Sequence, residues 1–178
     1  KGPADLEAGA TYFLAWIDFD AGRFEPAAKK FADLVAKHPK HPFAAESIYQ
    51  QAVCLSKAGK TAEALGRARA YLKAEPKGKY AVEAQFLTGR CLAGMGKHAE
   101  AAKVFSAVAG TEASLAASAL YELAWAQQRT AKKAEAIATY RKLIAKYPAT
   151  EYAAQAKEAL KEIKAKEAEA RPAAKTAK

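Results

Sequence analysis

The chain has 178 residues, of which 51% are hydrophobic and 27% are charged, and its formal net charge at pH 7 is +10. No stretch approaches the roughly 18 consecutive apolar residues of a membrane-spanning helix, so we expect no membrane span. The lysines alternate with glutamates, as on a solvated surface, which argues against nucleic acid as a partner. Much of the hydrophobic content is alanine and few residues are β-branched, which favours helices.

Helical patterns separated by turn residues follow one another from the start of the chain to its end. They predict helices over residues 5–21, 24–37, 42–57, 61 to about 75, 80–95, 99–109, 114–129, 133–147 and 150–168. Asp5 and Thr61 stand where a side chain can cap a helix start. The first helix is apolar on two faces, so both must be covered or one must bind something else. One of these faces carries Leu6, Ala10, Phe13, Leu14 and Ile17.

A repeat organises these helices into pairs. The turn residues Gly22, Gly59, Gly96 and Ala131 are spaced 37, 37 and 35 residues apart, a period typical of helical repeat proteins. Small residues recur with the same period on the first helix of each pair, where they allow close helix crossing: Ala15, Ala52, Gly89 and Ala124. One hairpin cannot bury both of its faces, so we expect the hairpins to stack around a continuous core.

The repeat sets the predicted fold and domain organisation. We expect an all-α chain, an α-α superhelix of about four helical hairpins with a C-terminal capping helix. The repeat domain spans residues 1–168, with units at about 8–41, 45–78, 82–115 and 117–150 and the capping helix at 150–168. Residues 169–178 are a short tail rich in alanine and lysine, which we expect to be disordered.

The order of residues within each unit resembles the tetratricopeptide repeat. A small residue is followed by glycine at the turn, then alanine, an aromatic residue and a final proline, over residues 8–150. The unit junctions KHPKHPFAAES, EPKGKYAVEA and KYPATEYAAQA are similar to bacterial cell-envelope members, the outer-membrane assembly lipoproteins and the Tol–Pal coordinator. This resemblance implies a periplasmic or outer-membrane-associated location, with the cytoplasm as the alternative. Because the sequence starts with Lys1 and shows no signal core, we expect its targeting segment to lie outside the sequence.

One face of the first helices carries the candidate binding residues. Aromatic residues occupy the same place in every unit, and four residues later come two tryptophans and one arginine. In tetratricopeptide proteins the first helices line the concave surface, so the resemblance places this face in a groove for a peptide. The alternative is that the aromatic residues only pack between hairpins. The predicted partner-binding residues are Tyr12, Trp16, Tyr49, Phe86, Arg90, Tyr121 and Trp125.

Patterns that indicate catalysis or metal binding are absent from the sequence. No glycine-rich phosphate loop or catalytic triad appears, so we expect no enzyme activity and no cofactor. His38 and His41 lack further ligands nearby in sequence, which favours a solvated loop over a metal site. Cys54 and Cys91 occupy the same place in successive repeats, about 10 Å apart in a stack, too far for a disulfide.

Two functions therefore remain open. In the first, the chain is a non-enzymatic scaffold that binds a protein or peptide segment in its concave groove. In the second, it is a structural subunit held in a larger assembly by its end helices, with no peptide in the groove. Self-association through the N-terminal helix would favour the second function.

Overall fold

The computed structural model describes residues 2–111 and 114–170, and this part of the chain contains nine α-helices and no strand. The helices agree with the predicted segments to within a few residues at each end. Their bounds are α1 (Pro3–Asp20), α2 (Phe24–Lys37), α3 (Ala44–Lys57), α4 (Thr61–Ala74), α5 (Ala81–Gly94), α6 (His98–Ala109), α7 (Ala116–Arg129), α8 (Lys133–Lys146) and α9 (Glu151–Ala170). Residues 169–170 of the predicted tail are thus helical, and residues 171–178 lie outside the described part.

Each hairpin turns through a residue in the left-handed conformation. Gly22, Gly59 and Gly96 have φ between 73° and 78°, and Ala131 takes the same role at 58°. The residue after each turn donates its backbone N–H back into the first helix, as Arg23 does to the carbonyl of Asp18 at 2.8 Å. Such bonds satisfy carbonyls that a helix end leaves open, so one backbone motif closes all four turns.

The predicted side-chain caps at Asp5 and Thr61 are wrong. Helix α1 begins one turn before the expected position, with Gly2 as its N-cap, and Asp5 lies in its first turn. Helix α4 has Lys60 as its N-cap, and the Thr61 hydroxyl points back to the carbonyl of Gly59. The tight turn fixes where the second helix starts, so no capping side chain is needed there.

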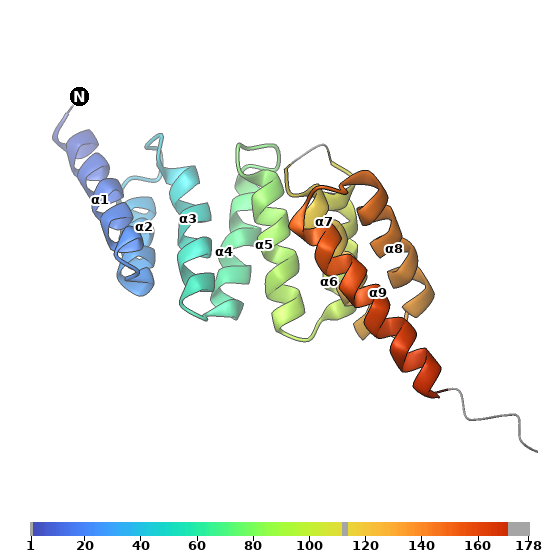
Figure 1. Cartoon of the computed structure of the whole chain (residues 1–178). Coiled ribbons are helices and arrows are strands. Elements are labelled where there is room, and N and C mark those ends of the chain that lie inside the picture. Colours follow the sequence, from blue (N-terminus) through green and yellow to red (C-terminus); the bar gives the residue numbers. More distant parts are fainter. Residues whose placement is uncertain (1, 112–113, 171–178) are drawn as a thin grey trace, which may run out of the picture.

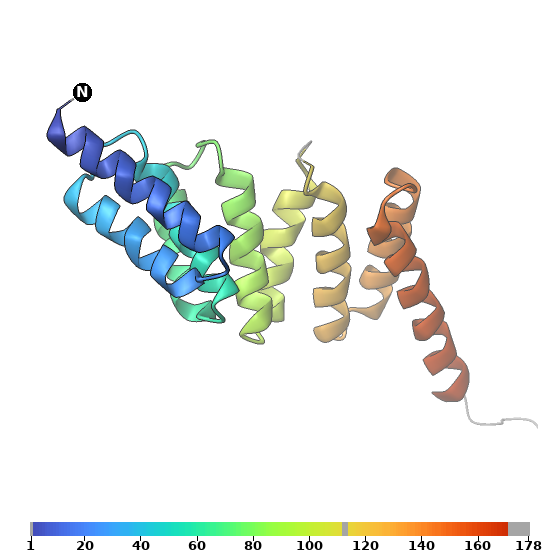
Figure 2. The ribbon, with the colours of Figure 1, turned by 60° about the vertical axis from the view of Figure 1, so that its left-hand side comes forward.

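The helices follow one another along the molecule in chain order, with α1 and α9 at opposite ends (Figure 1, Figure 2). Every helix packs against its neighbours in sequence, so each first helix also meets the second helix of the preceding hairpin. Among the described residues, α3 also contacts α5, α5 contacts α7 and α7 contacts α9, whereas no two second helices pack to a similar extent. The first helices therefore form the inner side of the curved stack.

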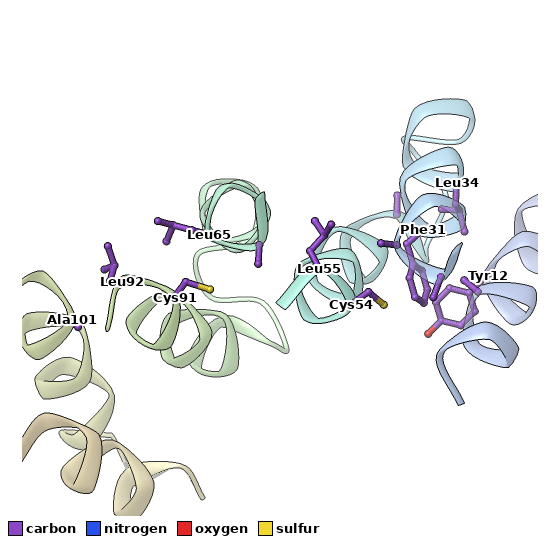
Figure 3. Close-up of a cluster of buried hydrophobic side chains, with 14 of the residues drawn as sticks. Tyr12, Phe31, Leu34, Cys54, Leu55, Leu65, Cys91, Leu92 and Ala101 are labelled. Carbon is purple, nitrogen blue, oxygen red and sulfur yellow. The ribbon is translucent and has the colours of Figure 1, made fainter. Parts of the chain in front are cut away.

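The core between these layers consists of two clusters, one with buried residues from Tyr12 to Phe105, part of which Figure 3 shows, and one with buried residues from Val108 to Ile163; the partly buried Phe86 packs against both. The small residues Ala15, Ala52, Gly89 and Ala124 are all buried, as expected for helix crossings. A methyl group at Gly89 would stand 2.6 Å from the ring of Phe105, which shows how closely α5 and α6 approach. The cysteines Cys54 and Cys91 are buried and free, and burial raises the pKa of both thiols, to about 12 for Cys54.

Candidate functional site: a groove along the first helices

The inner side of the stack contains three open hollows. The first, of about 380 Å³, lies between α3 and α5; its lining includes Tyr49, Glu83 and Phe86. The second, of about 350 Å³, lies between α5 and α7. The third, of about 600 Å³, lies between α7 and α9.

These hollows adjoin one another because they share wall residues. Arg90 lines both the first and the second, and Tyr121 and Trp125 line both the second and the third. Together they form one groove from α3 to α9, and we use "the groove" for these three hollows.

Five of the seven predicted binding residues line the groove, and the other two lie outside it. Tyr49, Phe86, Arg90, Tyr121 and Trp125 all stand in its walls. The remaining two, Tyr12 and Trp16, belong to α1, which contributes to none of the three hollows.

Tyr12 is held by stacking and by a hydrogen bond, and its stacking recurs one unit later, where Tyr49 stacks on Tyr80. The Tyr12 side chain is buried, its ring stacks on Phe43 with centroids 4.2 Å apart, and its hydroxyl donates to Glu46 at 2.9 Å. Glu46 also accepts a hydrogen bond from Tyr80 at 2.7 Å, so one carboxylate links α1, α3 and the N-cap of α5. Trp16 is half-buried and meets the rings of Tyr12, Phe19 and Phe31 edge-on.

The aromatic residue of each first helix packs on an aromatic ring of the second helix in its own hairpin. The centroid distances are nearly constant, between 5.6 and 5.9 Å. The pairs are Tyr12–Phe31, Tyr49–Tyr71, Phe86–Phe105 and Tyr121–Tyr140. These rings therefore hold the hairpins together, and Tyr49, Phe86 and Tyr121 add an exposed edge to the groove. Packing and groove lining are two roles of the same side chains.

Trp125 differs from the paired rings because polar groups flank it. The guanidinium of Arg129 lies 4.9 Å from the centre of its ring, a favourable cation–π distance, and His98 meets it edge-on. The ring is half-buried and faces two hollows at once. It offers the largest apolar surface in the groove that is not paired with another aromatic ring of its own hairpin.

Burial controls the ionisation of several groove side chains. Burial, followed by the charge of Glu83, raises the pKa of Tyr49 to about 12. Burial also raises the pKa of Glu122, against the opposing charge of Arg90. Arg90 itself is exposed on α5, where it provides a cation at the middle of the groove.

Sequence reasoning missed the wall that α9 contributes. Gln155, Glu158, Glu162 and Lys166 line the third hollow, and they follow one another at spacings of three or four residues. This helical periodicity of polar residues was a readable signal. It was overlooked because a terminal helix with a charged surface is equally typical of a simple cap.

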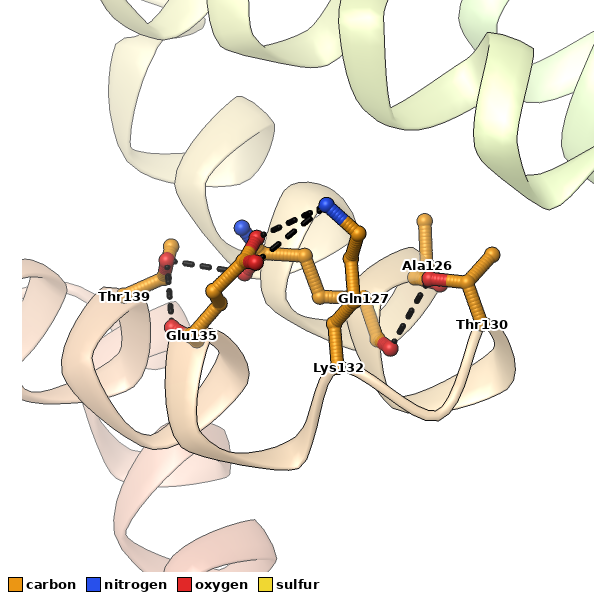
Figure 4. A network of polar contacts seen from close by, with 6 residues as sticks. All are labelled: Ala126, Gln127, Thr130, Lys132, Glu135 and Thr139. Carbon is orange, nitrogen blue, oxygen red and sulfur yellow. Dashed lines mark hydrogen bonds and ion pairs between the residues drawn. The ribbon is translucent and has the colours of Figure 1, made fainter.

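A fourth hollow, of about 550 Å³, lies outside the groove between α6 and the start of α8. Its polar groups bond to one another (Figure 4). Thr139 donates to the side-chain oxygen of Gln127 at 2.8 Å, and Lys132 pairs with Glu135 at 3.2 Å. The first of these contacts joins α8 to α7, and the second lies within the start of α8, so both hold the fourth hairpin in place.

The described residues contain no group of three or more side chains suited to hold a metal ion. His41 instead contacts Asp5 at 3.1 Å and also meets the ring of Phe43, and His38 lies 3.8 Å from Glu7. The two histidines thus join the loop before α3 to helix α1. Within the same part of the chain, no helix is both long and apolar enough to span a lipid bilayer.

Four stacked hairpins of this period, with an inner groove along the first helices, define a tetratricopeptide-type solenoid and hence a protein-interaction scaffold. A family model described as an outer membrane lipoprotein, YfiO, matches residues 5–173. The chain therefore belongs to the YfiO family of outer membrane lipoproteins. No curated protein matches the chain.

Solved structures agree with this fold. The chain is similar to YrrB, described as a tetratricopeptide protein with an unusual peptide-binding site, at 22% identity over 85% of this chain and 74% of that one, with a TM-score of 0.71. MamA from Desulfovibrio magneticus shares 21% identity over 83% and 77% of the two chains, with a TM-score of 0.69. Apo RapI reaches a TM-score of 0.76 at 10% identity, over 88% of this chain and 47% of its own. At these identities the likeness supports the fold alone.

Proposed function

We propose that this chain acts as a scaffold of the bacterial cell envelope and binds an extended or helical segment of a partner protein in the groove. The observation that carries the proposal is the continuity of the three hollows, which meet at Arg90, Tyr121 and Trp125. A continuous groove suits a segment of several residues better than a small molecule, which is held in a more enclosed cavity.

The groove walls indicate what such a segment would contain. Trp125, Phe86 and Leu87 offer apolar surface for two or more apolar anchors of the ligand. Arg90, Arg129 and Lys166 alternate with carboxylates, so the segment would carry charges of both signs. Trp16 lies beyond the end of the groove towards α1, where a longer segment would reach it.

Binding can be measured through Trp125, because the chain has only two tryptophans. In a Trp16→Phe variant, the fluorescence of Trp125 alone reports on the groove. Peptides selected from a random library on the wild-type chain should shift this fluorescence as they bind. In the wild-type background, Trp125→Ala should reduce the binding free energy of the same peptides by about 2 kcal/mol, as is typical of a central interface tryptophan.

Arg90→Ala should weaken binding less, and its effect should shrink in high salt because an exposed charge is screened. Arg67→Ala is the matched control, since Arg67 is an exposed arginine of α4 that lines none of the three hollows. Equal losses from Arg67→Ala and Arg90→Ala would place the site elsewhere. Melting curves of each variant separate lost contacts from lost folding.

The proposed location follows from the family. Its description as an outer membrane lipoprotein supports a periplasmic or outer-membrane-associated scaffold, with the cytoplasm as the alternative. Fractionation of the full-length protein with protease protection would decide between them. We also expect no binding to duplex DNA or RNA at physiological salt, because the basic residues are mixed with acidic ones.

One observation favours the second function, a structural subunit held by its end helices. The outward face of α1 exposes four large apolar side chains. A scaffold that used only its groove would not need them. The two functions are separable, because groove variants would leave an end-to-end assembly intact.

A further inference from the structure

The outward face of helix α1 is the largest apolar feature outside the groove. Leu6, Phe13, Leu14 and Ile17 are between 50% and 65% exposed, and Met95 is the only other large exposed hydrophobic residue among those described. At this exposure the four side chains present roughly 500 Å² of apolar surface, near the upper end for the largest patch of a monomeric protein, which is often functional. We call these four residues, with the exposed Ala10 between them, the α1 face.

The α1 face points away from the rest of the molecule. Ala8, Tyr12 and Ala15 lie on the other side of the same helix, where they are buried. Figure 1 and Figure 2 both show α1 at the end of the stack, with no described element beyond it. No part of the described chain therefore covers this face.

The same face is covered in every later unit. In α3, α5 and α7 it packs against the second helix of the preceding hairpin, α2, α4 and α6 respectively. The residues equivalent to Ala10 and Ile17 are buried there and are small: Ser47 and Cys54, Ala84 and Cys91, Ala119 and Ala126. The fold thus covers this position with a helix three times. Only α1 lacks one, and at the places of Phe13 and Ile17 its side chains are the largest and most apolar of the series.

We propose that a second copy of this chain covers the α1 face, through antiparallel pairing of the two α1 helices. The cover must be a helix with a free apolar stripe. Within the described residues, the large exposed hydrophobic side chains that could form such a stripe are those of α1 itself. This inference does not depend on the use of the groove.

The sequence of the α1 face complements itself in that arrangement. An antiparallel register that sets Ala10 opposite Phe13 of the other copy also sets Leu6 opposite Ile17. A large ring then faces a small side chain at the crossing, which lets the two helices pack closely. The two faces together bury roughly 1,000 Å², which is the lower limit for a specific interface.

Charges at the border of the face do not oppose this register. Glu7 stands at one edge of the face and Asp20 at the other, and both are exposed. With a rise of about 1.5 Å per residue, the Glu7 residues of the two copies are offset by roughly 13 Å along the axis. That exceeds the Debye length of about 8 Å at physiological salt, so their repulsion is weak. Glu7 is also paired with Lys37 of its own copy, at 3.2 Å.

The first test is the mass of the 178-residue chain by analytical ultracentrifugation over two orders of magnitude in concentration. We expect a monomer–dimer equilibrium in the wild type. Phe13→Glu and Ile17→Glu should each weaken it at least tenfold while circular dichroism retains the wild-type helix content. Met95→Glu is the matched control, because Met95 is 41% exposed on another element, and it should leave the dimer unchanged.

The second test is crosslinking through an introduced cysteine. A short bis-maleimide should crosslink two copies of the Ala10→Cys variant through the new cysteines. The reaction is specific to them because Cys54 and Cys91 are buried and should not react. Ala138→Cys, at an exposed position of α8, should give no dimer under the same conditions. The proposal is overturned if the wild type stays monomeric throughout, or if a dimer survives both glutamate variants. It is equally overturned if, in the full-length protein, Ala10→Cys crosslinks only to a preceding segment of its own chain or to a different protein.

Discussion

Ala131 adopts a backbone φ of 58° at the turn where the three equivalent hairpins have glycine. A left-handed conformation costs a residue with a Cβ about 1–2 kcal/mol, whereas glycine adopts it freely. At Gly22, Gly59 and Gly96 an added methyl group would meet no atom within 4 Å, so only backbone strain separates alanine from glycine there. The turn geometry was predictable from the repeat, and it holds even where the residue is unfavourable.

Ala131→Gly should therefore stabilise the chain by about 1 kcal/mol, and Gly59→Ala should destabilise it by a similar amount. The two exchanges are matched because the same backbone hydrogen bond closes both turns. The N–H of Lys132 donates to the carbonyl of Gln127 after Ala131, and the N–H of Lys60 donates to the carbonyl of Leu55 after Gly59. Denaturant unfolding measures both free energies. A loss of stability in Ala131→Gly would show that the methyl group makes a contact that outweighs the strain.

Asp18 is the most heavily paired carboxylate of the described residues. Its side chain accepts hydrogen bonds from Lys30 and from Arg23, and these two cations hold its pKa below the ordinary value. A lowered pKa means that the pairs stabilise the fold above the ordinary value of about 3.9, and that this contribution is lost as pH falls through the folded-state value. These contacts join the end of α1 to α2.

Asp18→Asn should lower the melting temperature at pH 7, and the difference from the wild type should narrow as the pH is taken below about 4. Asp20→Asn serves as the control, because Asp20 is an exposed carboxylate two residues away. Melting curves between pH 7 and pH 3 measure the effect. A difference that stays constant over this range would mean that the loss comes from packing rather than from charge.

At the scale of the element, the repeat determines how two helices cross. On the second helices the repeat carries the aromatic residues Phe31, Phe105 and Tyr140, and the structure pairs each with an aromatic ring of its first helix. In the third hairpin Gly89 replaces alanine, and the ring of Phe105 fills the space of a side chain. These contacts could be predicted from the sequence. The short distance between two crossing backbones requires a small residue on one helix and leaves room for an aromatic ring on the other, and this requirement recurs in every hairpin.

Gly89→Ala should consequently destabilise the chain by about 1–3 kcal/mol, since the new methyl group displaces the Phe105 ring. The penalty should shrink in a Phe105→Leu background, where the smaller side chain leaves room. Gly66→Ala, at a helical glycine of α4 with no atom within 4 Å, should instead stabilise by about 0.5–1 kcal/mol. The unfolding free energies of the wild type, the two single variants and the double variant form a double-mutant cycle, and Gly66→Ala is its control. An unchanged Gly89→Ala penalty in both backgrounds would argue against the clash.

At the scale of the whole molecule, the period predicted the fold better than it predicted the groove. A repeat fixes equivalent positions, and it placed Tyr49, Phe86 and Tyr121 on one face. It could not show that Tyr12, at the same position, is buried and donates a hydrogen bond to Glu46, although its stacking on Phe43 does recur as the stacking of Tyr49 on Tyr80. Nor could it show the polar wall of α9. The residues hardest to predict are those at the two ends, where the neighbours of one side are missing.

Helix α9 has two roles: it closes the stack, and it forms a wall of the groove. Ala153, Ala156 and Ile163 are buried, and Tyr152 lies 6.1 Å from the ring of Tyr121. Without α9, the apolar sides of α7 and α8 that it covers would face water. The polar residues on its groove side, by contrast, contribute nothing to this cover.

Removal of residues 150–178 should therefore lower the melting temperature and cause aggregation, because a terminal repeat needs a cover with a polar outer face. Removal of residues 171–178 alone, which keeps α9 whole, should leave stability unchanged. Glu158→Ala with Glu162→Ala should keep the fold and alter only peptide binding, because both side chains line the third hollow and are exposed. Light scattering, melting curves and the Trp125 fluorescence assay separate these outcomes. A soluble chain of wild-type stability that ends at Ala149 would rule out the capping role, and α9 would then serve the groove alone.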